Sequence, residues 1–231
     1  REVQVSVTCD SSAAFIGQTV RVVTTITDVT PAGHGTSDFT TDDPTPVVTF
    51  DDLGRNGDFS DSRKISHTSD EIVYEAYYTP SAGDAGTVTL RVDYAGSAVY
   101  EGAFGETTLT VETRPTTTRV TCETDPLYVD QRTKVTIVVT DVGTAGVPSI
   151  PSGVLHLGTS GDGNFYASSD PSKTTAITQV PLSPISPVQA QAVVWYEPET
   201  APDAIASHSI HVDYIAAGAD ASAQIHSNSS G

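Results

Sequence analysis

The sequence predicts an all-β protein made of two β-sandwich domains in tandem. Three observations support this prediction: a length of 231 residues, an internal repeat, and short stretches of alternating polar and apolar residues rich in Val, Ile and Thr. The length suits two domains of about 100–150 residues, each large enough for its own core. No stretch of the chain shows a convincing helical period.

The internal repeat is clearest near the start of each copy. Val7-Thr8-Cys9 recurs as Val120-Thr121-Cys122. The same offset in numbering carries Thr27-Asp28-Val29 onto Thr140-Asp141-Val142, and ten of the positions from 7 to 33 are identical in the second copy. The chain is therefore two copies of one unit.

The two copies differ in length between their shared motifs. Repeat one is longer around residues 33–46, so repeat two has the shorter first loop, and repeat two carries a Pro- and Ser-rich insertion near residues 170–187. Loops absorb such differences while strands keep register, so both segments are expected to be loops. We place the domains at residues 1–113 and 114–231. The alignment also pairs Leu109 with Ile225 and sets Gly231 opposite Pro115, which makes the chain two repeat units long.

Each copy has the residue pattern of antiparallel strands. Residues 87–94 alternate apolar and polar side chains, and residues 209–214 repeat the pattern. Stretches 19–28 and 132–141 are rich in Val, Ile and Thr, which suit a half-buried pleated surface. Strands with one solvent-exposed face and one buried face are typical of antiparallel sheets that pack on a single core. Further strands, giving about seven per copy as in a sandwich, are expected at residues 3–8, 47–50, 72–78 and 107–111, with counterparts in copy two.

The charge of the chain excludes several kinds of partner. The sequence has 29 acidic and 11 basic residues, a formal net charge of −18, and its lysines are Lys64, Lys134 and Lys173. Phosphate binding depends on clustered Lys and Arg, so neither nucleic acid nor a polybasic membrane contact is expected. The longest apolar runs fall far short of the roughly 20 residues that span a bilayer, so no membrane span is predicted.

Six short motifs together carry a family resemblance. They are Val7-Thr8-Cys9, Ile16-Gly17-Gln18-Thr19, Gly57-Asp58-Phe59, Tyr78-Thr79-Pro80, Gly86-Thr87-Val88 and Val92-Asp93-Tyr94-Ala95-Gly96. This set resembles the bacterial immunoglobulin-like repeat superfamily, which includes the invasin- and intimin-type repeats of large surface proteins. The resemblance covers nearly the whole chain twice and implies two immunoglobulin-like sandwiches that serve as spacers, stalks or binding units. In some members a second cysteine pairs with the one at the Cys9 position, and here Val22 and Val135 hold its place.

Cys9 and Cys122 are equivalent residues of successive copies. Placed end to end, they would lie far beyond the ~7 Å between Cα atoms that a disulfide allows. We expect each to be a small buried residue at a strand end. The alternative is a disulfide to a neighbouring subunit, which an oxidising compartment would favour.

An acidic cluster flanks the strand expected at 47–50. Asp51, Asp52, Asp58 and Asp61 are its calcium candidates, because calcium takes six to eight oxygens from loop carboxylates and carbonyls. Their spacing does not fit an EF-hand loop. Asp28 and Asp141 offer a second set of carboxylates. We expect solvated acidic loops and no cofactor, with calcium as the alternative.

The late histidines and the single tryptophan are the remaining candidates. Zinc needs three or four converging ligands, and only His211 and His226 are expected to be near one another, both facing outward, so surface histidines are predicted. Trp195 matches Tyr77 of repeat one. An outward Trp195 would suit stacking on a sugar ring, but packing against a loop is the favoured expectation.

The sequence has no motif for catalysis. It lacks a Gly-x-Ser-x-Gly elbow, a His-Glu-x-x-His pair and a phosphate-binding Gly-rich loop. We predict a non-catalytic extracellular or cell-surface repeat module, part of a stalk, adhesin or filament, whose partners are neighbouring repeats, subunits, or a surface glycan or protein. Two alternatives stay open: a carbohydrate- or protein-binding module, and a subunit of a self-assembling filament. The start at Arg1 predicts a processed product or an excised fragment.

Overall fold

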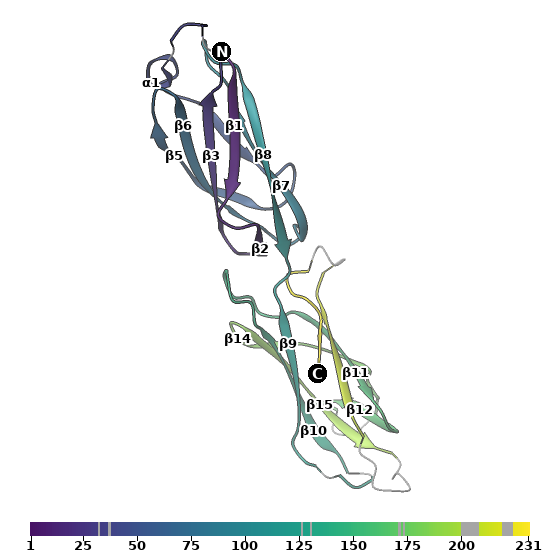
Figure 1. The fold of residues 1–231 in the computed structure, drawn as a ribbon. Helices are drawn as coiled ribbons and strands as arrows, with labels where there is room; N and C mark the ends of the chain where they lie inside the picture. Colours follow the sequence, from purple (N-terminus) through teal and green to yellow (C-terminus); the bar gives the residue numbers. More distant parts are fainter. Residues whose placement is uncertain are drawn as a thin grey trace. The chain divides into compact units, whose positions relative to one another are not determined.

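A computed structural model describes the chain except for residues 32, 37, 126, 130, 171, 173, 200–207 and 219–223. Its regular structure is almost all β, in two units, unit 1 (Arg1–Glu112) and unit 2 (Thr113–Gly231). Each unit pairs two sheets, as Figure 1 shows for the labelled strands. The predicted fold class, all-β with tandem β-sandwiches, is confirmed.

The described residues of unit 1 form eight strands and one short helix. One sheet has the order β1-β3-β6-β5 and the other has the order β2-β8-β7-β4. With β1 as strand A and β8 as strand G, these are the A-B-E-D and C-F-G sheets of an immunoglobulin sandwich, with β2 added beside β8 at the edge of the second sheet. The elements are β1 (Val3–Cys9), β2 (Ala13–Phe15), β3 (Val20–Asp28), α1 (Phe39–Asp42), β4 (Val48–Asp51), β5 (Asp58–His67), β6 (Glu71–Thr79), β7 (Gly86–Tyr94) and β8 (Ala103–Glu112).

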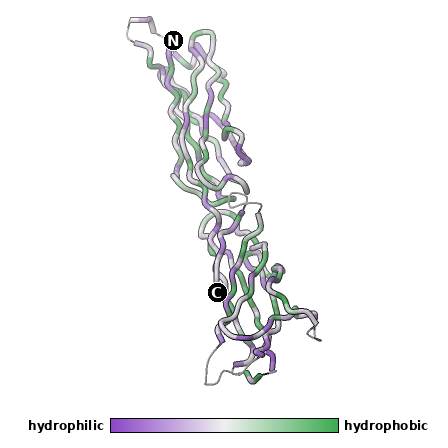
Figure 2. The backbone as a smooth tube through the Cα atoms, turned by 90° about the vertical axis from the view of Figure 1, so that its right-hand side faces the viewer, coloured by the Kyte–Doolittle hydropathy of each residue, from purple (hydrophilic) through white to green (hydrophobic). Residues whose placement is uncertain are grey.

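The core of unit 1 follows from the alternation of its strands. Along β7, Val88, Leu90 and Val92 are fully buried, while the residues between them are partly exposed. Val22 and Ile26 of β3 face them with no exposed surface. Burying each large aliphatic side chain contributes about 1.5–3 kcal/mol. Figure 2 shows the result as hydrophobic and hydrophilic residues that alternate along the strands of each unit.

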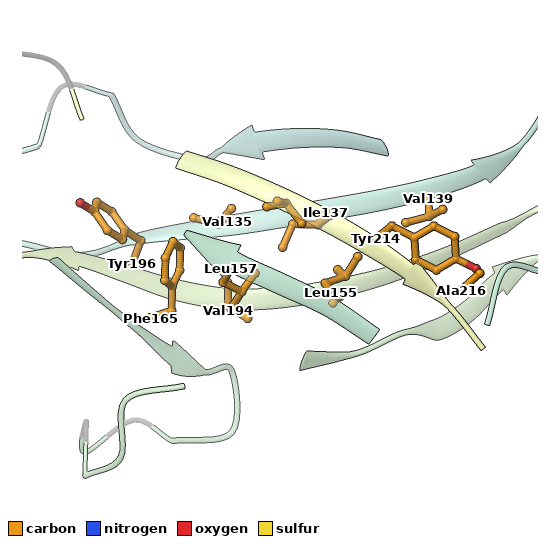
Figure 3. Close-up of a cluster of buried hydrophobic side chains, with 12 residues drawn as sticks. Val135, Ile137, Val139, Leu155, Leu157, Phe165, Val194, Tyr196, Tyr214 and Ala216 are labelled. Carbon is orange, nitrogen blue, oxygen red and sulfur yellow. The ribbon is translucent and has the colours of Figure 1, made fainter. Parts of the chain in front are cut away.

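Unit 2 repeats this arrangement. Its sheets have the orders β12-β15-β10-β9, with β14 also on β15, and β13-β11-β16-β17. Figure 3 shows the core between them, with Phe165 and Tyr196 at one end and Tyr214 and Ala216 at the other. The elements are β9 (Thr116–Cys122), β10 (Thr133–Asp141), β11 (Gly153–Thr159), β12 (Gly163–Ala167), β13 (Gln179–Pro181), β14 (Ser183–Ser186), β15 (Gln189–Pro198), β16 (Ile210–Ala216) and β17 (Ser229–Ser230).

The strand register corrects the end of the repeat alignment. Gly105 of β8 lies opposite Val92, and Gly231 exchanges both main-chain hydrogen bonds with Val212, the counterpart of Val92. Gly231 is therefore the counterpart of Gly105, and its predicted match with Pro115 is wrong. Ile225 accepts a main-chain bond from Arg114 as Val99 does from Arg1, so it matches Val99 rather than Leu109. The sequence alignment lost register across residues 219–223, which are outside the described part of the chain.

Two segments expected to be loops contain regular structure. The insertion near 170–187 holds β13, which pairs with β11, and β14, which pairs with β15. Both strands are short and contain proline, as edge strands tolerate. The long loop of unit 1 holds helix α1, whose Asp38 side chain accepts a bond from the Thr40 amide at the N-cap. The loop prediction is thus wrong for these residues.

Candidate functional site

An arginine–carboxylate pair stands at the start of each unit, buried in unit 2 and partly exposed in unit 1. In unit 2, Arg114 Nε donates to Asp141 Oδ2 at 2.7 Å, and both side chains are only 1% exposed. In unit 1, Arg1 Nε donates to Asp28 Oδ2 at 2.8 Å, with side chains 18% and 12% exposed. The two arginines are equivalent positions of the two copies, as are the two aspartates, so the pair belongs to the repeat. From the sequence, Asp28 and Asp141 were considered as a second set of calcium ligands. In the structure each of them binds an arginine side chain.

Each arginine of these pairs also binds a loop. Arg114 donates from its two Nη groups to the carbonyls of Ala145 and Gly143, and Arg1 donates to those of His34 and Gly35. A guanidinium has five donors in a fixed fork, so one side chain ties a strand end and a loop together. The pair therefore fixes the point where the chain enters each sandwich.

His226 completes the buried cluster of unit 2. Its Nε2 lies 3.2 Å from the Ser149 carbonyl oxygen and 3.8 Å from Asp141 Oδ2, and the residue is 1% exposed. Burial lowers the pKa of His226 despite the nearby Asp141 carboxylate. Burial would raise the pKa of Asp141, but hydrogen bonds from Arg114, Ser149 and Gly143 lower it below its usual value. The predicted outward position of His226 is wrong, because it lies beside Arg114 in the strand register, where Tyr100 lies in unit 1.

The calcium candidates do not converge on one point. Asp52 is buried, and its carboxylate accepts bonds from the amides of Arg55 and Gly57. Asp51 accepts a bond from the Leu53 amide, while Asp58 and Asp61 are exposed on β5. In the parts of the chain that the structure describes, no group of three or more His, Cys, Asp or Glu side chains is arranged to hold a metal ion.

Asp52 instead belongs to a buried tyrosine–carboxylate cluster. The Tyr78 hydroxyl donates to Asp52 Oδ2 at 3.3 Å and lies 3.5 Å from Asp84 Oδ2. Burial, followed by the charges of Asp84 and Asp52, raises the pKa of Tyr78. Asp84 accepts bonds from the amides of Asn56 and Ser81, so these carboxylates tie two loops to the end of β6.

Unit 2 keeps the tyrosine of this cluster and changes its partners. The Tyr196 hydroxyl lies 2.8 Å from His208 Nδ1 and 3.2 Å from Thr159 Oγ1. In both units a glycine makes room for the ring, because a Cβ atom at Gly57 would lie 2.3 Å from the Tyr78 oxygen and one at Gly163 would lie 2.4 Å from the Tyr196 oxygen. The matching Gly–Tyr pairs indicate a packing role in the repeat.

Trp195 lies on the outer face of its sheet, between Lys134 and Tyr166 on the neighbouring strands. It is half-buried, and the Arg132 guanidinium carbon lies 4.7 Å from the centre of its ring. Such a cation–π contact stabilises the arginine over the ring. Arg132 thus covers part of the surface that a sugar would stack on.

The two cysteines lie at the ends of equivalent strands. Cys9 pairs in register with Val22, and Cys122 with Val135. Cys9 is half-buried and Cys122 is exposed, and both are free thiols. Burial, then a neighbouring aspartate, raises the pKa of each thiol, which lowers the thiolate fraction at neutral pH. The expectation of a buried residue is wrong for Cys122, which is exposed at the end of β9.

Two of the other late histidines, His156 and His211, lie apart from these clusters. His156 is exposed on β11, and His211 is exposed on β16, where its Nε2 lies 2.9 Å from Asp213 Oδ1. His208 is half-buried against Tyr196. Sequence reasoning missed that Arg1 and Arg114 pair with Asp28 and Asp141, although the repeat offset that both pairs share was a usable signal.

Comparison with known proteins adds little to this geometry. No protein-family model and no curated protein matches the chain. Among the described residues, no helix has the length and apolar character to cross a bilayer.

Two solved structures that the chain is similar to are bacterial adhesins. One is the Escherichia coli adhesin FdeC, with 13% identity over 96% of this chain and 62% of that one, at a TM-score of 0.31. The other is the Yersinia pseudotuberculosis adhesin InvE, with 13% identity over 93% of this chain and 55% of that one, at a TM-score of 0.38. The chain thus spans less than two thirds of either adhesin chain. Neither score is high enough to bear on fold or role, which rest on the chain's own strand order and contacts.

Proposed function

We propose that the chain is a non-catalytic, force-resisting repeat segment of a bacterial extracellular surface protein with a role in adhesion. The observation that carries this proposal is that the two units share one sandwich plan, with the same strand order in the first sheet and the same Arg–Asp pair where the chain enters each unit. Repetition of a module is the usual way to build length between a cell surface and a distal site. The net charge of −18 suits a module crowded among acidic copies of itself.

The terminal strands of unit 1 favour resistance to a pulling force. Arg1 is bonded beside the start of β8, through Val99 and Glu101, and Glu112 is the end of β8. A pull between these two ends acts along the strands. Parallel strand β2 is joined to β8 by bonds from Ile16 to Glu112 and from Thr110 to Ser12. A force along parallel strands shears these hydrogen bonds together instead of breaking them one at a time.

The buried ionisable groups also fit a structural role. Asp52 and Asp141 each accept main-chain amide bonds from their own loops, and Asp84 accepts one from its own loop and one from the loop of Asp52. Hydrogen-bonded buried carboxylates of this kind hold loops in place, since an unpaired buried charge costs several kcal/mol. These groups therefore serve the rigidity that a force-resisting repeat requires.

Single-molecule pulling on the full chain tests the proposal. We expect two unfolding events, each releasing about 35–40 nm of chain at ~3.4 Å per residue. Thr110→Pro removes the amide that donates to Ser12 and is expected to lower the unfolding force of unit 1 alone. Thr108→Pro is the matched control, because Thr108 lies on the same side of β8 ahead of its pairing with β2. Equal forces in the two variants, or a chain that extends without resistance, would contradict a force-resisting role.

A glycan-binding module is the competing function, and Trp195 is its best candidate. Arg132 over the Trp195 ring disfavours stacking on a sugar. A glycan array with the full chain separates the two functions. Saturable binding to one glycan class that Trp195→Ala abolishes would replace the force-resisting proposal, and no such binding is expected.

A further inference from the structure

A loop of unit 1 contains the dipeptide Asn56–Gly57, whose own atoms can react with each other. The main-chain nitrogen after an asparagine can attack the side-chain amide carbon and close a five-membered imide ring. Glycine has no Cβ atom to hinder this approach and adopts a wide range of backbone angles. The other two asparagines, Asn164 and Asn228, are followed by phenylalanine and serine. In a chain that is free to move, Asn56 is therefore the most reactive of the three.

Both main-chain amides of this dipeptide are held by buried carboxylates in the folded unit. The Asn56 amide donates to Asp84 Oδ1 at 2.8 Å, and the Gly57 amide donates to Asp52 Oδ2 at 3.1 Å. Asp84 has no exposed surface and Asp52 is 8% exposed. The rotation that moves the Gly57 nitrogen relative to the Asn56 side chain lies between these two amides. The two hydrogen bonds therefore fix the geometry on which ring closure depends.

The same contacts oppose the chemical step. The Gly57 nitrogen has to give up its proton to form the new bond, and the neighbouring negative charge of Asp52 disfavours the anion. The Tyr78 ring packs directly on the Gly57 main chain, where it would overlap a Cβ atom, and its hydroxyl donates to Asp52. Moving the Gly57 amide thus requires this buried cluster to open.

Unit 2 keeps the glycine of this dipeptide and replaces the asparagine. Gly163 packs on the Tyr196 ring as Gly57 packs on Tyr78, but the residue before Gly163 is Asp162. At this position unit 2 has no side-chain amide to lose. The shared packing explains the glycine in both units, and the asparagine is particular to unit 1.

We propose that Asn56–Gly57 is a self-modification site, which the folded unit protects and which reacts when the loop of residues 52–57 opens. The Gly57 nitrogen bonds to Asn56 Cγ and loses its proton to solvent, the Cγ–Nδ2 bond breaks, and Nδ2 takes up a proton and leaves as ammonia. Water then opens the ring at Cγ, which gives aspartate, or at the main-chain carbonyl, which gives isoaspartate. Water is the co-reactant that balances the change.

The isoaspartate product is expected to prevent the loop from closing again. Its chain runs through Cβ and Cγ, which adds one backbone atom between the two amides, so both can no longer fit Asp84 and Asp52 at once. The Asn56 side chain is exposed, so aspartate is tolerated there. The site thus records an opening of unit 1 as a covalent change. This inference does not depend on the force-resisting role.

The test follows residue 56 by peptide mass spectrometry, with the full chain kept folded or held unfolded in urea at neutral pH. We expect the Asn56 side-chain amide to be lost at least about 10-fold faster in urea, because the folded chain reacts only from its open form. Asn164 and Asn228 are internal controls and should react more slowly than Asn56 in urea. Equal Asn56 rates in the two conditions would overturn the protection. An Asn56 that reacts no faster than Asn164 in urea would overturn the site.

Two variants test the hydrogen bond to Gly57 in native buffer. Asp52→Ala releases the Gly57 amide, so we expect Asn56 to react faster than in the wild type. Asp51→Ala is the matched control, because the Asp51 carboxylate accepts its bond from the Leu53 amide of the same loop. Amide exchange in β6 shows whether each variant is folded, and equal rates in two folded variants would contradict the role of Asp52. If Asp52→Ala does not fold, the urea comparison in the wild type decides.

The fate of the loop is measured after the chain is returned from urea. The fraction with isoaspartate at residue 56 is expected to show fast exchange of the Gly57 amide. Asn56→Gln chains given the same treatment should recover slow exchange, since glutamine would have to close a larger ring. Full recovery of Gly57 protection in the isoaspartate fraction would show that the change does not hold the loop open.

Discussion

At the scale of single residues, the same kind of Arg–Asp ion pair occurs in both units, and the pair of unit 2 is more deeply buried than that of unit 1. Arg114 and Asp141 are removed from water, while Arg1 and Asp28 keep part of their surface exposed. Removing one partner of a buried pair leaves the other charge without compensation, and this costs far more than the loss of an exposed pair. The two copies therefore provide a matched comparison within one chain.

Replacing the arginine in each unit tests how much burial adds to the stabilising effect of the pair. Arg114→Leu leaves Asp141 buried without its guanidinium, so we expect unit 2 to lose about 3–5 kcal/mol of unfolding free energy. Arg1→Leu is expected to cost unit 1 about 1–2 kcal/mol, because water reaches Asp28. Urea unfolding with Trp195 fluorescence measures the first, and amide exchange in β3 measures the second. Equal losses in the two units would show that burial does not set the strength of the pair.

The pH dependence of unit 2 follows from His226. Its folded pKa lies below its usual value of 6.5, so over this range the unfolded chain binds a proton that the folded chain does not. Stability is then fully present above about pH 6.5 and falls as the pH is lowered. The lowered pKa of Asp141 adds a further loss below its usual range near 3.8. Melting of unit 2 from pH 7.5 to 5 should decline less in His226→Gln than in the wild type or in the exposed control His211→Gln. Parallel declines in all three proteins would contradict this assignment.

At the scale of elements, alternation predicted the strands that bury one face. β3, β7, β10 and β16 all contain a period of two in their sequence, and all of them line a core. β5 was missed because most of its side chains are exposed, Arg63 and Lys64 among them, so its sequence has no buried face to reveal it. The pairing of β5 with β6 holds it in the sheet, although its own sequence has no strand pattern. The short strands β13 and β14 were missed because their segment is rich in proline and serine, a composition that is typical of loops.

Site residues were predicted less well than strands, for a related reason. A carboxylate in a loop looks the same in sequence whether it faces solvent, a metal ion or the amides of its own loop. Asp52 turned inward to the Tyr78 hydroxyl, while Asp58 and Asp61 stayed exposed. His226 was misplaced because its partner Arg114 lies at the opposite end of the sequence of unit 2.

The contribution of β8 to its neighbours is measurable at Val7 and Val120. Val7→Ala opens a cavity under a complete strand, so we expect a loss of about 2 kcal/mol in unit 1. Val120→Ala removes the same atoms from a partly solvated position, and a loss below about 1 kcal/mol is expected in unit 2. Amide exchange within β3 and within β10 reports each loss. A larger loss for Val120 than for Val7 would mean that β8 does not add to the burial of Val7.

At the scale of the whole molecule, the two units share a plan but not the same amount of burial. Unit 1 closes its second sheet with the long strand β8, while unit 2 has the short strand β17 in that place. Apolar burial supplies most of the free energy of folding, and β8 adds Leu109 and Val111 to the core of unit 1. We therefore expect unit 2 to unfold at a lower urea concentration than unit 1. Trp195, the only tryptophan, follows unit 2, and pulse-labelled amide exchange of residues 20–28 and 133–141 follows both units in the same samples. If residues 20–28 lose protection first, a feature other than the last strand sets the order of unfolding.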